Sequence, residues 1–309
     1  MYCKAIENPV AAMNIIDLFN SFQTQEQAVE YLEEVRWRGH PVCPYCKSEH
    51  VGRHASGDRK QQRWQCRGCG RAFAVTVGTI FHGTHVPLAK WFLLLALMLN
   101  AKKSASAYQI ARDIGVRRPT VWSMMHRVRT AMANDPDQQG LLYGIVEADD
   151  TYVGGKPRKG NRRANDAPKK RGRGTKKVPV VGAVERRGRV IAQPAKPGDL
   201  SARGLAKFIG RFVDKRGTVL ITDEFGGYSR VGQTMLHATV NHSIEYANGI
   251  IHTDTIESFW ALVKRAWYGT HHHYSQKYIP LYIAEACYRY NHRADANSFD
   301  ITLETMVRA

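Results

Sequence analysis

Three carboxylates lie within four positions of the segment GIVEADDTYVGGK, residues 144–156. They are Glu147, Asp149 and Asp150, and the apolar residues before them are typical of a buried strand. Because side chains alternate between the two faces of a strand, Glu147 and Asp149 share one face and Asp150 points the other way. Asp149 lies nearer the end of the strand, where ligands bind in α/β sheets.

Two further acids follow apolar patterns later in the chain. Asp223 ends the short strand pattern VLITD, and Glu257 lies in IHTDTIESFWALVKR, which has the periodicity of a helix. Asp254 and Lys264 lie near the same face of that helix as Glu257. Taken singly, each acid also suits a surface or capping role.

Acids that converge from separate elements repel one another unless a cation lies between them. Carboxylates with few other ligands suit Mg²⁺, which keeps water and takes phosphate oxygens as further ligands. Two such ions about 3.5–4 Å apart activate an attacking oxygen and stabilise the leaving oxygen in phosphodiester displacement. The acids Asp149, Asp223 and Glu257 are therefore a candidate catalytic metal site.

Four of the six cysteines form two Cys-x-x-Cys pairs, Cys43 with Cys46 and Cys66 with Cys69. Nineteen residues separate the two pairs, which suits four thiolates around a tetrahedral Zn²⁺. Four protein ligands leave no open position, so this zinc would be structural. Gly70 directly after the second pair is suited to the positive φ that such a turn often requires.

Residues 104–132 predict a short helix, a turn at Gly115 and a second helix that starts at Pro119 or Thr120. Tyr108, Ile110, Ala111 and Ile114 would form the apolar face of the first helix, and Val121, Met124, Met125 and Val128 that of the second. This is the arrangement of a helix-turn-helix, which reads DNA with the start of its second helix. The residues expected to face DNA are Arg117, Arg118, Thr120, Ser123 and Arg127. A plain helical hairpin that packs the cysteine module onto the rest is the alternative.

The net charge of +18 and the pI of about 9.8 favour a polyanionic partner, with nucleic acid as the first candidate. No apolar run approaches the roughly 20 residues of a membrane-spanning helix, so we expect a soluble, intracellular protein. Residues 156–177 hold eleven Lys or Arg and one acid, without periodicity. We expect this segment, with Lys169, Lys170, Arg171 and Arg173, to be a loop or arm that binds DNA phosphates.

The chain falls into five predicted regions. They are an N-terminal helical segment (1–40), a zinc ribbon (41–86), a helix-turn-helix region (87–135), a catalytic domain (141–295) with the basic insertion 156–177, and a C-terminal tail (296–309). From residue 141 onward the patterns run strand, strand, strand, helix, strand, helix, which is a mixed α/β order.

These motifs in combination resemble the bacterial insertion-sequence transposases of the fifteen-ninety-five group. The resemblance is carried by CPYC…CRGCGRAF…TIFHGTHVPLAKWF, VEADDTYVGGK and HTDTIESFWALVKR…YRYNHR, and it covers residues from about 20 to 293. It implies an N-terminal zinc ribbon and an RNase H-like DDE domain. It also implies Mg²⁺-dependent cleavage at transposon ends, with Mn²⁺ as a possible substitute, followed by strand transfer into target DNA.

Carried over residue by residue, the resemblance makes Asp149 and Asp223 the first two catalytic acids. Glu257 matches the third, and Lys264, seven positions later, matches a Lys that contacts DNA. Many relatives have Asn where this chain has Asp254, so Asp254 remains an alternative third ligand. The expected partners are double-stranded DNA and a second copy of the chain, in the cytoplasm of a prokaryote. Two other functions stay open: a DNA-binding protein without catalysis, and a nuclease of the same fold without strand transfer.

Overall fold

The computed structural model describes residues 15–54, 63–154, 177–240 and 251–308. The chain divides into two compact units, which are described separately. Unit 1 comprises Met1–Asn134 and His292–Ala309, and unit 2 comprises Asp135–Asn291.

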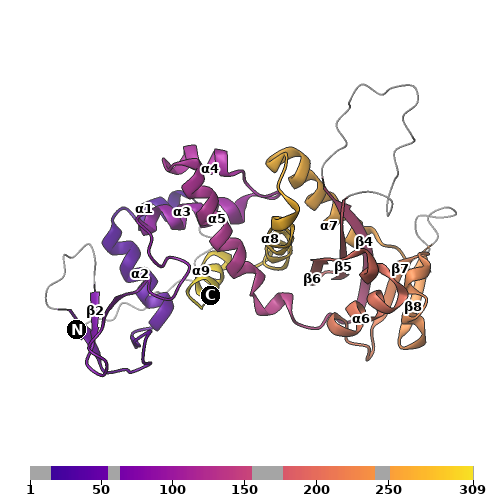
Figure 1. Cartoon of the computed structure of the whole chain (residues 1–309), viewed down its shortest axis with the longest axis horizontal. Coiled ribbons are helices and arrows are strands. Elements are labelled where there is room, and N and C mark those ends of the chain that lie inside the picture. The colour runs from indigo at the N-terminus through magenta and orange to yellow at the C-terminus, as the bar shows by residue number, and fades with distance from the viewer. Residues whose placement is uncertain (1–14, 55–62, 155–176, 241–250, 309) are drawn as a thin grey trace. The chain divides into compact units, whose positions relative to one another are not determined.

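Unit 1 combines helices with one small sheet (Figure 1). Its helices are α1 (Ile15–Ser21), α2 (Gln25–Trp37), α3 (Leu88–Asn100), α4 (Ala107–Ile114), α5 (Arg118–Ala133) and α9 (Ser298–Arg308). Its antiparallel sheet has the order β1 (Val51–Arg53), β2 (Arg63–Cys66) and β3 (Ala72–Ala74).

The start of α2 follows from a capping box. The hydroxyl of Thr24 accepts from the backbone N–H of Gln27, and the Gln27 side chain accepts from the N–H of Thr24. Two of the four unpaired N–H groups of the helix are thereby satisfied. Helix α3 is the apolar segment WFLLLALML, and seven of its residues are buried.

The residues expected as a C-terminal tail include a helix, α9, that belongs to unit 1. Phe299 packs edge-on against Phe92 of α3, and Asp300 accepts a hydrogen bond from Tyr31 of α2. Description of this segment as a tail was wrong, because its apolar residues complete the core of unit 1.

Unit 2 is a five-stranded sheet with helices on both faces. Its strands are β4 (Ile145–Val153), β5 (Val178–Glu185), β6 (Val190–Pro194), β7 (Val219–Asp223) and β8 (Leu236–Val240). Its helices are α6 (Ala202–Phe212), α7 (Asp254–Arg265) and α8 (Ile279–Asn291), and a π-helical turn, Ala266–His271, continues α7.

The strand order is β6-β5-β4-β7-β8. Strands β4, β5 and β6 are antiparallel neighbours, whereas β7 and β8 run parallel to β4. This mixed α/β topology is that of an RNase H-like domain, so the predicted fold class is confirmed. The edge strand β8 was not predicted, although its sequence LHATV alternates apolar and polar residues.

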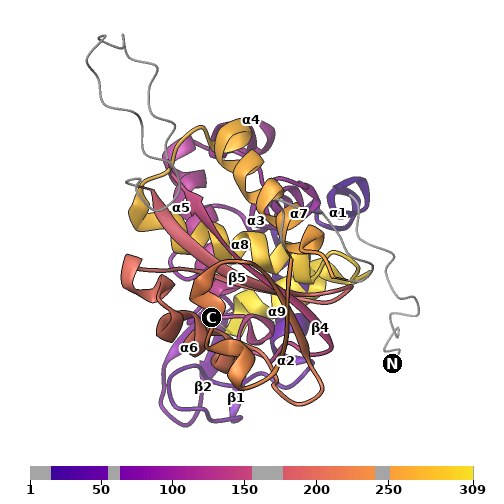
Figure 2. The ribbon, with the colours of Figure 1, turned by 90° about the vertical axis from the view of Figure 1, so that its right-hand side faces the viewer.

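The alternation of side chains along β4 divides the core in two. Val146 and Ala148 pack on one face against α6, while Val153 joins α7 and α8 on the other face (Figure 1, Figure 2). The carboxylates of Glu147 and Asp149 therefore belong to the face of α7. Among the described residues, no helix is both long enough and apolar enough to cross a membrane.

Candidate active site and metal centre

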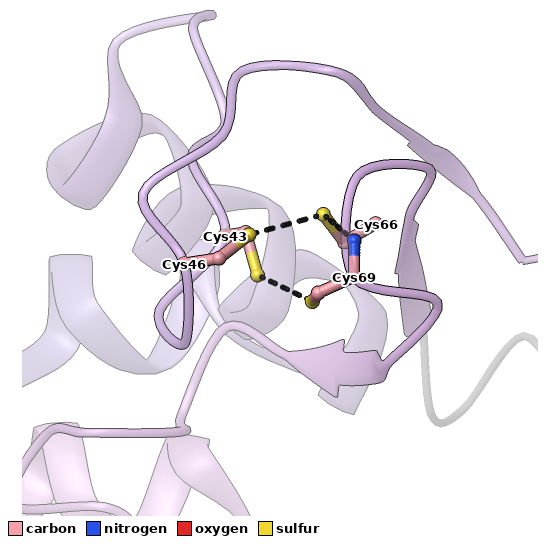
Figure 3. Close-up of side chains that lie close together, drawn as sticks. All are labelled: Cys43, Cys46, Cys66 and Cys69. Atoms are coloured by element: carbon pink, nitrogen blue, oxygen red, sulfur yellow. Dashed lines mark hydrogen bonds between the residues drawn. The ribbon is translucent and has the colours of Figure 1, made fainter.

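The four paired cysteines come together in unit 1 (Figure 3). Their sulfur atoms all lie within 4.8 Å of one another, and the Sγ of Cys43 is 3.7 Å from that of Cys69. The Sγ atoms of Cys46 and Cys66 are 3.5 Å apart. These separations are far above the roughly 2.05 Å of a disulfide, and the cysteines are free thiols.

Each cysteine pair sits in a tight turn with a left-handed residue directly after it. Lys47 has φ 61° and Gly70 has φ 70°. The positive φ predicted at Gly70 is confirmed, while Lys47 adopts the same region without glycine's freedom. The backbone N–H of Cys69 points at the sulfur of Cys66 at 3.4 Å and lowers the pKa of the Cys66 thiol to about 6. The turn therefore favours the thiolate, which is the form that binds metals.

The first two candidate acids lie side by side on parallel strands in unit 2. The register pairs Ile145 with Val219 and Ala148 with Thr222, so the next step along both strands brings Asp149 beside Asp223. Both residues are half-buried. One oxygen of Asp149 accepts the N–H of Asp150 at 2.7 Å, and Asp223 accepts the N–H of Phe225 at 3.2 Å.

The third candidate acid, Glu257, lies in the first turn of α7. Its carboxylate accepts from the hydroxyl of Thr253 at 3.1 Å, and α7 packs on β4. The side chains of Ile256, Phe259, Trp260 and Val263 are buried against the sheet. The side chains of Glu257 and Lys264 are exposed.

The pKa of Asp149 responds to the charges of both other candidate acids. Burial raises the pKa of Asp149 to about 7, and the charges of Asp223, Asp150 and Glu257 raise it as well. Carboxylates that repel in this way are relieved by a bound cation, which suits a metal site. Within the described residues, the carboxylate oxygens of the three acids do not all lie within 4.8 Å of one another, in contrast to the thiols.

Glu147 and Asp254, two other acids named from the sequence, have different surroundings. Both oxygens of Glu147 are occupied by hydrogen-bond donors from Arg186, Thr255 and Ile256, which leaves this carboxylate no free position for a metal. The side chain of Asp254 is 68% exposed, and its nearest charged partner is His252 at 3.5 Å. Asp254 is not among the charges that raise the pKa of Asp149, whereas Glu257 is.

The helices predicted for DNA reading are present, with one face assigned wrongly. Helix α4 ends at Gly115 with φ 61°, and Val121, Met124, Met125 and Val128 of α5 are buried as expected. Tyr108, however, is 61% exposed, with the guanidinium of Arg112 over its ring. The apolar face of α4 therefore consists of Ile110 and Ile114, which are buried, together with the half-buried Ala111.

Most of the residues predicted to face DNA are exposed at the start of α5. Arg117, Arg118, Thr120 and Ser123 all lie on the surface of the unit. Arg127 is exposed as well, but its Nη1 donates to the carbonyls of Ile80 and His82 at 3.0 and 2.9 Å. Its guanidinium thus links α5 to the loop before α3. Lys169, Lys170, Arg171 and Arg173 lie outside the described residues, between β4 and β5.

Sequence reasoning missed the groups that hold α7 in place. Arg186, in the turn between β5 and β6, contacts both Glu147 and the carbonyl of His252. A separate link, also missed, joins α8 to β6, where Asn291 pairs with both backbone groups of Val190. The only available hint was an acid in the middle of a buried strand, since such a charge requires a partner.

This geometry defines a class of protein. One unit carries a four-cysteine module, and the other is an RNase H-like domain with acids on adjacent strands. Two family models match the chain, a transposase zinc-ribbon domain over residues 23–72 and an ISXO2-like transposase domain over residues 141–291. A relative described as an uncharacterized protein in transposable element ISH50 of Halobacterium salinarum is 31% identical over 277 residues. That match covers 85% of this chain and 90% of the relative.

The chain belongs to this family of insertion-sequence transposases, which join a zinc ribbon to an ISXO2-like DDE domain. Solved structures with some similarity include a Mos1 strand transfer complex, with a TM-score of 0.30, 13% identity and coverage of 70% of this chain and 74% of that one. A pre-cleavage Mos1 transpososome has a TM-score of 0.29 and 13% identity over 98% of this chain and 96% of that one. TM-scores this low carry no argument about function.

Proposed function

We propose that the protein binds the two ends of its insertion sequence and catalyses metal-dependent cleavage there, followed by strand transfer into target DNA. The observation that carries this proposal is the convergence of Asp149, Asp223 and Glu257 from two parallel strands and one helix. Three acids in mutual repulsion fit divalent ions better than they fit a binding surface for polyanionic DNA.

The two metal sites have different roles. Cys43, Cys46, Cys66 and Cys69 fit Zn²⁺, because four free sulfurs meet at one point and one of them is poised as a thiolate. Asp149, Asp223 and Glu257 would hold Mg²⁺, with Mn²⁺ as a substitute. When bound, such ions activate the attacking oxygen and stabilise the leaving oxygen of a phosphodiester.

The residues of the chain itself hold the ions and the DNA. In the first reaction a water oxygen bonds to the scissile phosphorus, the bond to the 3′-oxygen breaks, and that oxygen takes a proton. In the second, the freed 3′-hydroxyl bonds to a phosphorus of the target and displaces a second 3′-oxygen. Lys264, exposed two turns beyond Glu257 on α7, would bind a phosphate beside the scissile one.

DNA recognition falls to the other unit in this proposal. Arg117, Arg118, Thr120 and Ser123 of unit 1 would read DNA from the start of α5. The basic segment 156–177, which belongs to the same unit as the acids, would bind flanking phosphates. Because two ends must be held together, the active form is expected to be a dimer or larger. Cleavage at both ends would then be coupled to assembly.

The test uses labelled DNA with the element's own ends, incubated with Mg²⁺ and in buffer stripped of divalent ions. Wild type, Asp149→Ala, Asp254→Asn and Glu257→Gln are compared, with Asp214→Asn as the matched control. Asp214 lies near the opposite end of β4, where its N–H donates to the carbonyl of Leu142. We expect cleaved and joined products from wild type, Asp254→Asn and the control, and none from Asp149→Ala or Glu257→Gln, with DNA binding retained throughout.

Three other results are distinguishable. Cleavage without joined products indicates a nuclease that does not transfer strands. Specific binding without cleavage under any divalent ion contradicts the catalytic proposal and leaves a DNA-binding protein. Loss of activity in Asp254→Asn with full activity in Glu257→Gln would make Asp254 the third ligand.

A further inference from the structure

Glu147 is a carboxylate with no exposed surface in the middle of the sheet. Its Oε1 accepts from the Nε of Arg186 at 2.6 Å and from the hydroxyl of Thr255 at 2.9 Å. Its Oε2 accepts from the backbone N–H groups of Thr255 at 2.8 Å and Ile256 at 3.0 Å. Four donors, three of them from the start of α7, thus surround one side chain of β4.

Helix α7 depends on this carboxylate for its N-terminal cap. The residue at the N-cap position, Thr253, makes no side-chain bond to the helix backbone, because its hydroxyl donates to Glu257 instead. The second and third N–H groups of the helix, at Thr255 and Ile256, are the ones that an N-cap side chain normally satisfies. Glu147 supplies that cap from a neighbouring element, and its charge suits the positive end of the helix dipole.

Arg186 completes the arrangement from the turn between β5 and β6. Its Nε binds Glu147, and its Nη2 donates to the carbonyl of His252 at 2.9 Å, just before α7 begins. The Arg186 side chain is 17% exposed, so both charges of the pair are largely withdrawn from water. Glu147 thereby fixes the first turn of α7, and Arg186 fixes His252, just before the helix.

We propose that Glu147 and Arg186 form a positioning pair that sets the third catalytic acid against the other two. Glu147 lies two residues before Asp149 on the same face of β4, and it holds the two residues directly before Glu257. The buried side chain of Glu147 therefore sets the distance between Asp149 and Glu257. This inference rests on the proposed function for its catalytic consequence.

The competing interpretation is a buried ion pair that only stabilises the fold. The stabilising and the positioning interpretations predict different effects of a conservative substitution in the pair on metal binding and on the order of α7. A stabilising pair, once weakened, lowers the free energy of unfolding of the whole unit. A positioning pair also loosens the start of α7 while the protein stays folded, and it weakens metal binding at the acids.

The experiment compares Glu147→Gln with Glu185→Gln, a matched control. Glu185 is also a buried glutamate of the sheet, and its carboxylate accepts from the backbone N–H groups of Tyr143 and Arg189, which lie outside α7. Thr255→Val is the third variant, since it removes one hydroxyl bond and no charge. Three properties of the full-length protein are measured. They are hydrogen exchange, the binding of Mn²⁺ as followed by electron paramagnetic resonance, and the rate of cleavage of end DNA as a function of metal concentration.

We expect Glu147→Gln to speed exchange in the peptide that covers Thr255–Glu257 while α8 stays protected. Mn²⁺ binding and the cleavage rate should fall about 10–100-fold, the usual effect of removing a group that orients ligands. A raised Mn²⁺ concentration should restore part of the rate. Thr255→Val should show a smaller change in the same direction, and Glu185→Gln should bind Mn²⁺ as wild type does.

Exchange and Mn²⁺ binding decide the inference even if no cleavage is found, in which case only the proposed function fails. The positioning role is overturned if Glu147→Gln binds Mn²⁺ as wild type does with α7 still protected. It is also overturned if Glu185→Gln has the same effects, or if Glu147→Gln loosens α8 and the sheet as much as α7. Should Glu147→Gln fail to fold, unchanged exchange and Mn²⁺ binding in Thr255→Val would overturn the role.

Discussion

Replacing Asp149 with asparagine should stabilise unit 2 when no divalent metal is present. The pKa of Asp149 is raised from 3.8 to about 7, first by burial and then by the charges of Asp223, Asp150 and Glu257. The folded protein thus favours the neutral acid. Its contribution to stability is fully present below pH 3.8 and is lost as the pH rises through about 7.

The size of the effect follows from the shift. About 3 pKa units at 1.36 kcal/mol each give an upper limit of about 4 kcal/mol above pH 8. Partial solvent screening of a half-buried group reduces this, so we expect about 2 kcal/mol. Near pH 4 the difference should vanish, because the wild-type side chain is then neutral as well.

Hydrogen exchange of β4 and β5 peptides in denaturant is the suitable assay, because it reports on unit 2 apart from unit 1. Buffers should be passed over a chelating resin rather than treated with soluble chelator, which would strip the cysteine site. Added Mg²⁺ should reverse the order, since wild type gains metal binding and Asp149→Asn does not. Equal stability of the two proteins from pH 4 to 8.5 would refute the reasoning, as would a less stable variant at pH 8 without metal.

Three further outcomes follow from the geometry. Cys66→Ser should lower the zinc content from one ion per chain towards none and melt unit 1 at lower temperature, as measured by metal analysis and calorimetry. Arg118→Ala should weaken binding to the element's ends by about 1–3 kcal/mol and relax the sequence preference, because Arg118 is proposed to read bases; equal weakening on every DNA sequence, with the slope of log affinity against log salt reduced by about 1, would contradict base reading. Gly182→Ala should cost about 1–3 kcal/mol, because its new Cβ would lie 2.8 Å from the ring of Trp260; unchanged unfolding in denaturant would contradict that close approach.

The meeting of the four cysteines could be predicted from sequence because it depends on local pattern. Two Cys-x-x-Cys turns bring their own sulfurs together, and an acid in a buried strand takes its position from the strand itself. Parallel pairing of β4 with β7 then follows from the fold class, and it places Asp149 beside Asp223. Even the capping box of Thr24 and Gln27 is contained within four residues.

Contacts between residues that are far apart in the chain could not be predicted from the sequence. Tyr108 was assigned to a buried face from helical spacing alone, but spacing does not say which side of a short helix meets a neighbour. Arg127 has the spacing of a DNA contact, and its donors are used by carbonyls about 45 residues earlier.

Glu147 shows the same limit at the site itself. From sequence it is one of three clustered acids and shares a face with Asp149, and the pattern assigns it no role of its own. Only the tertiary structure brings Arg186, 39 residues away, and the first turn of α7, more than a hundred residues away, onto its two oxygens. With these donors bound to it, the carboxylate is the cap of the helix that carries Glu257. Its substitution should therefore weaken the metal site through Glu257, and not through a lost ligand.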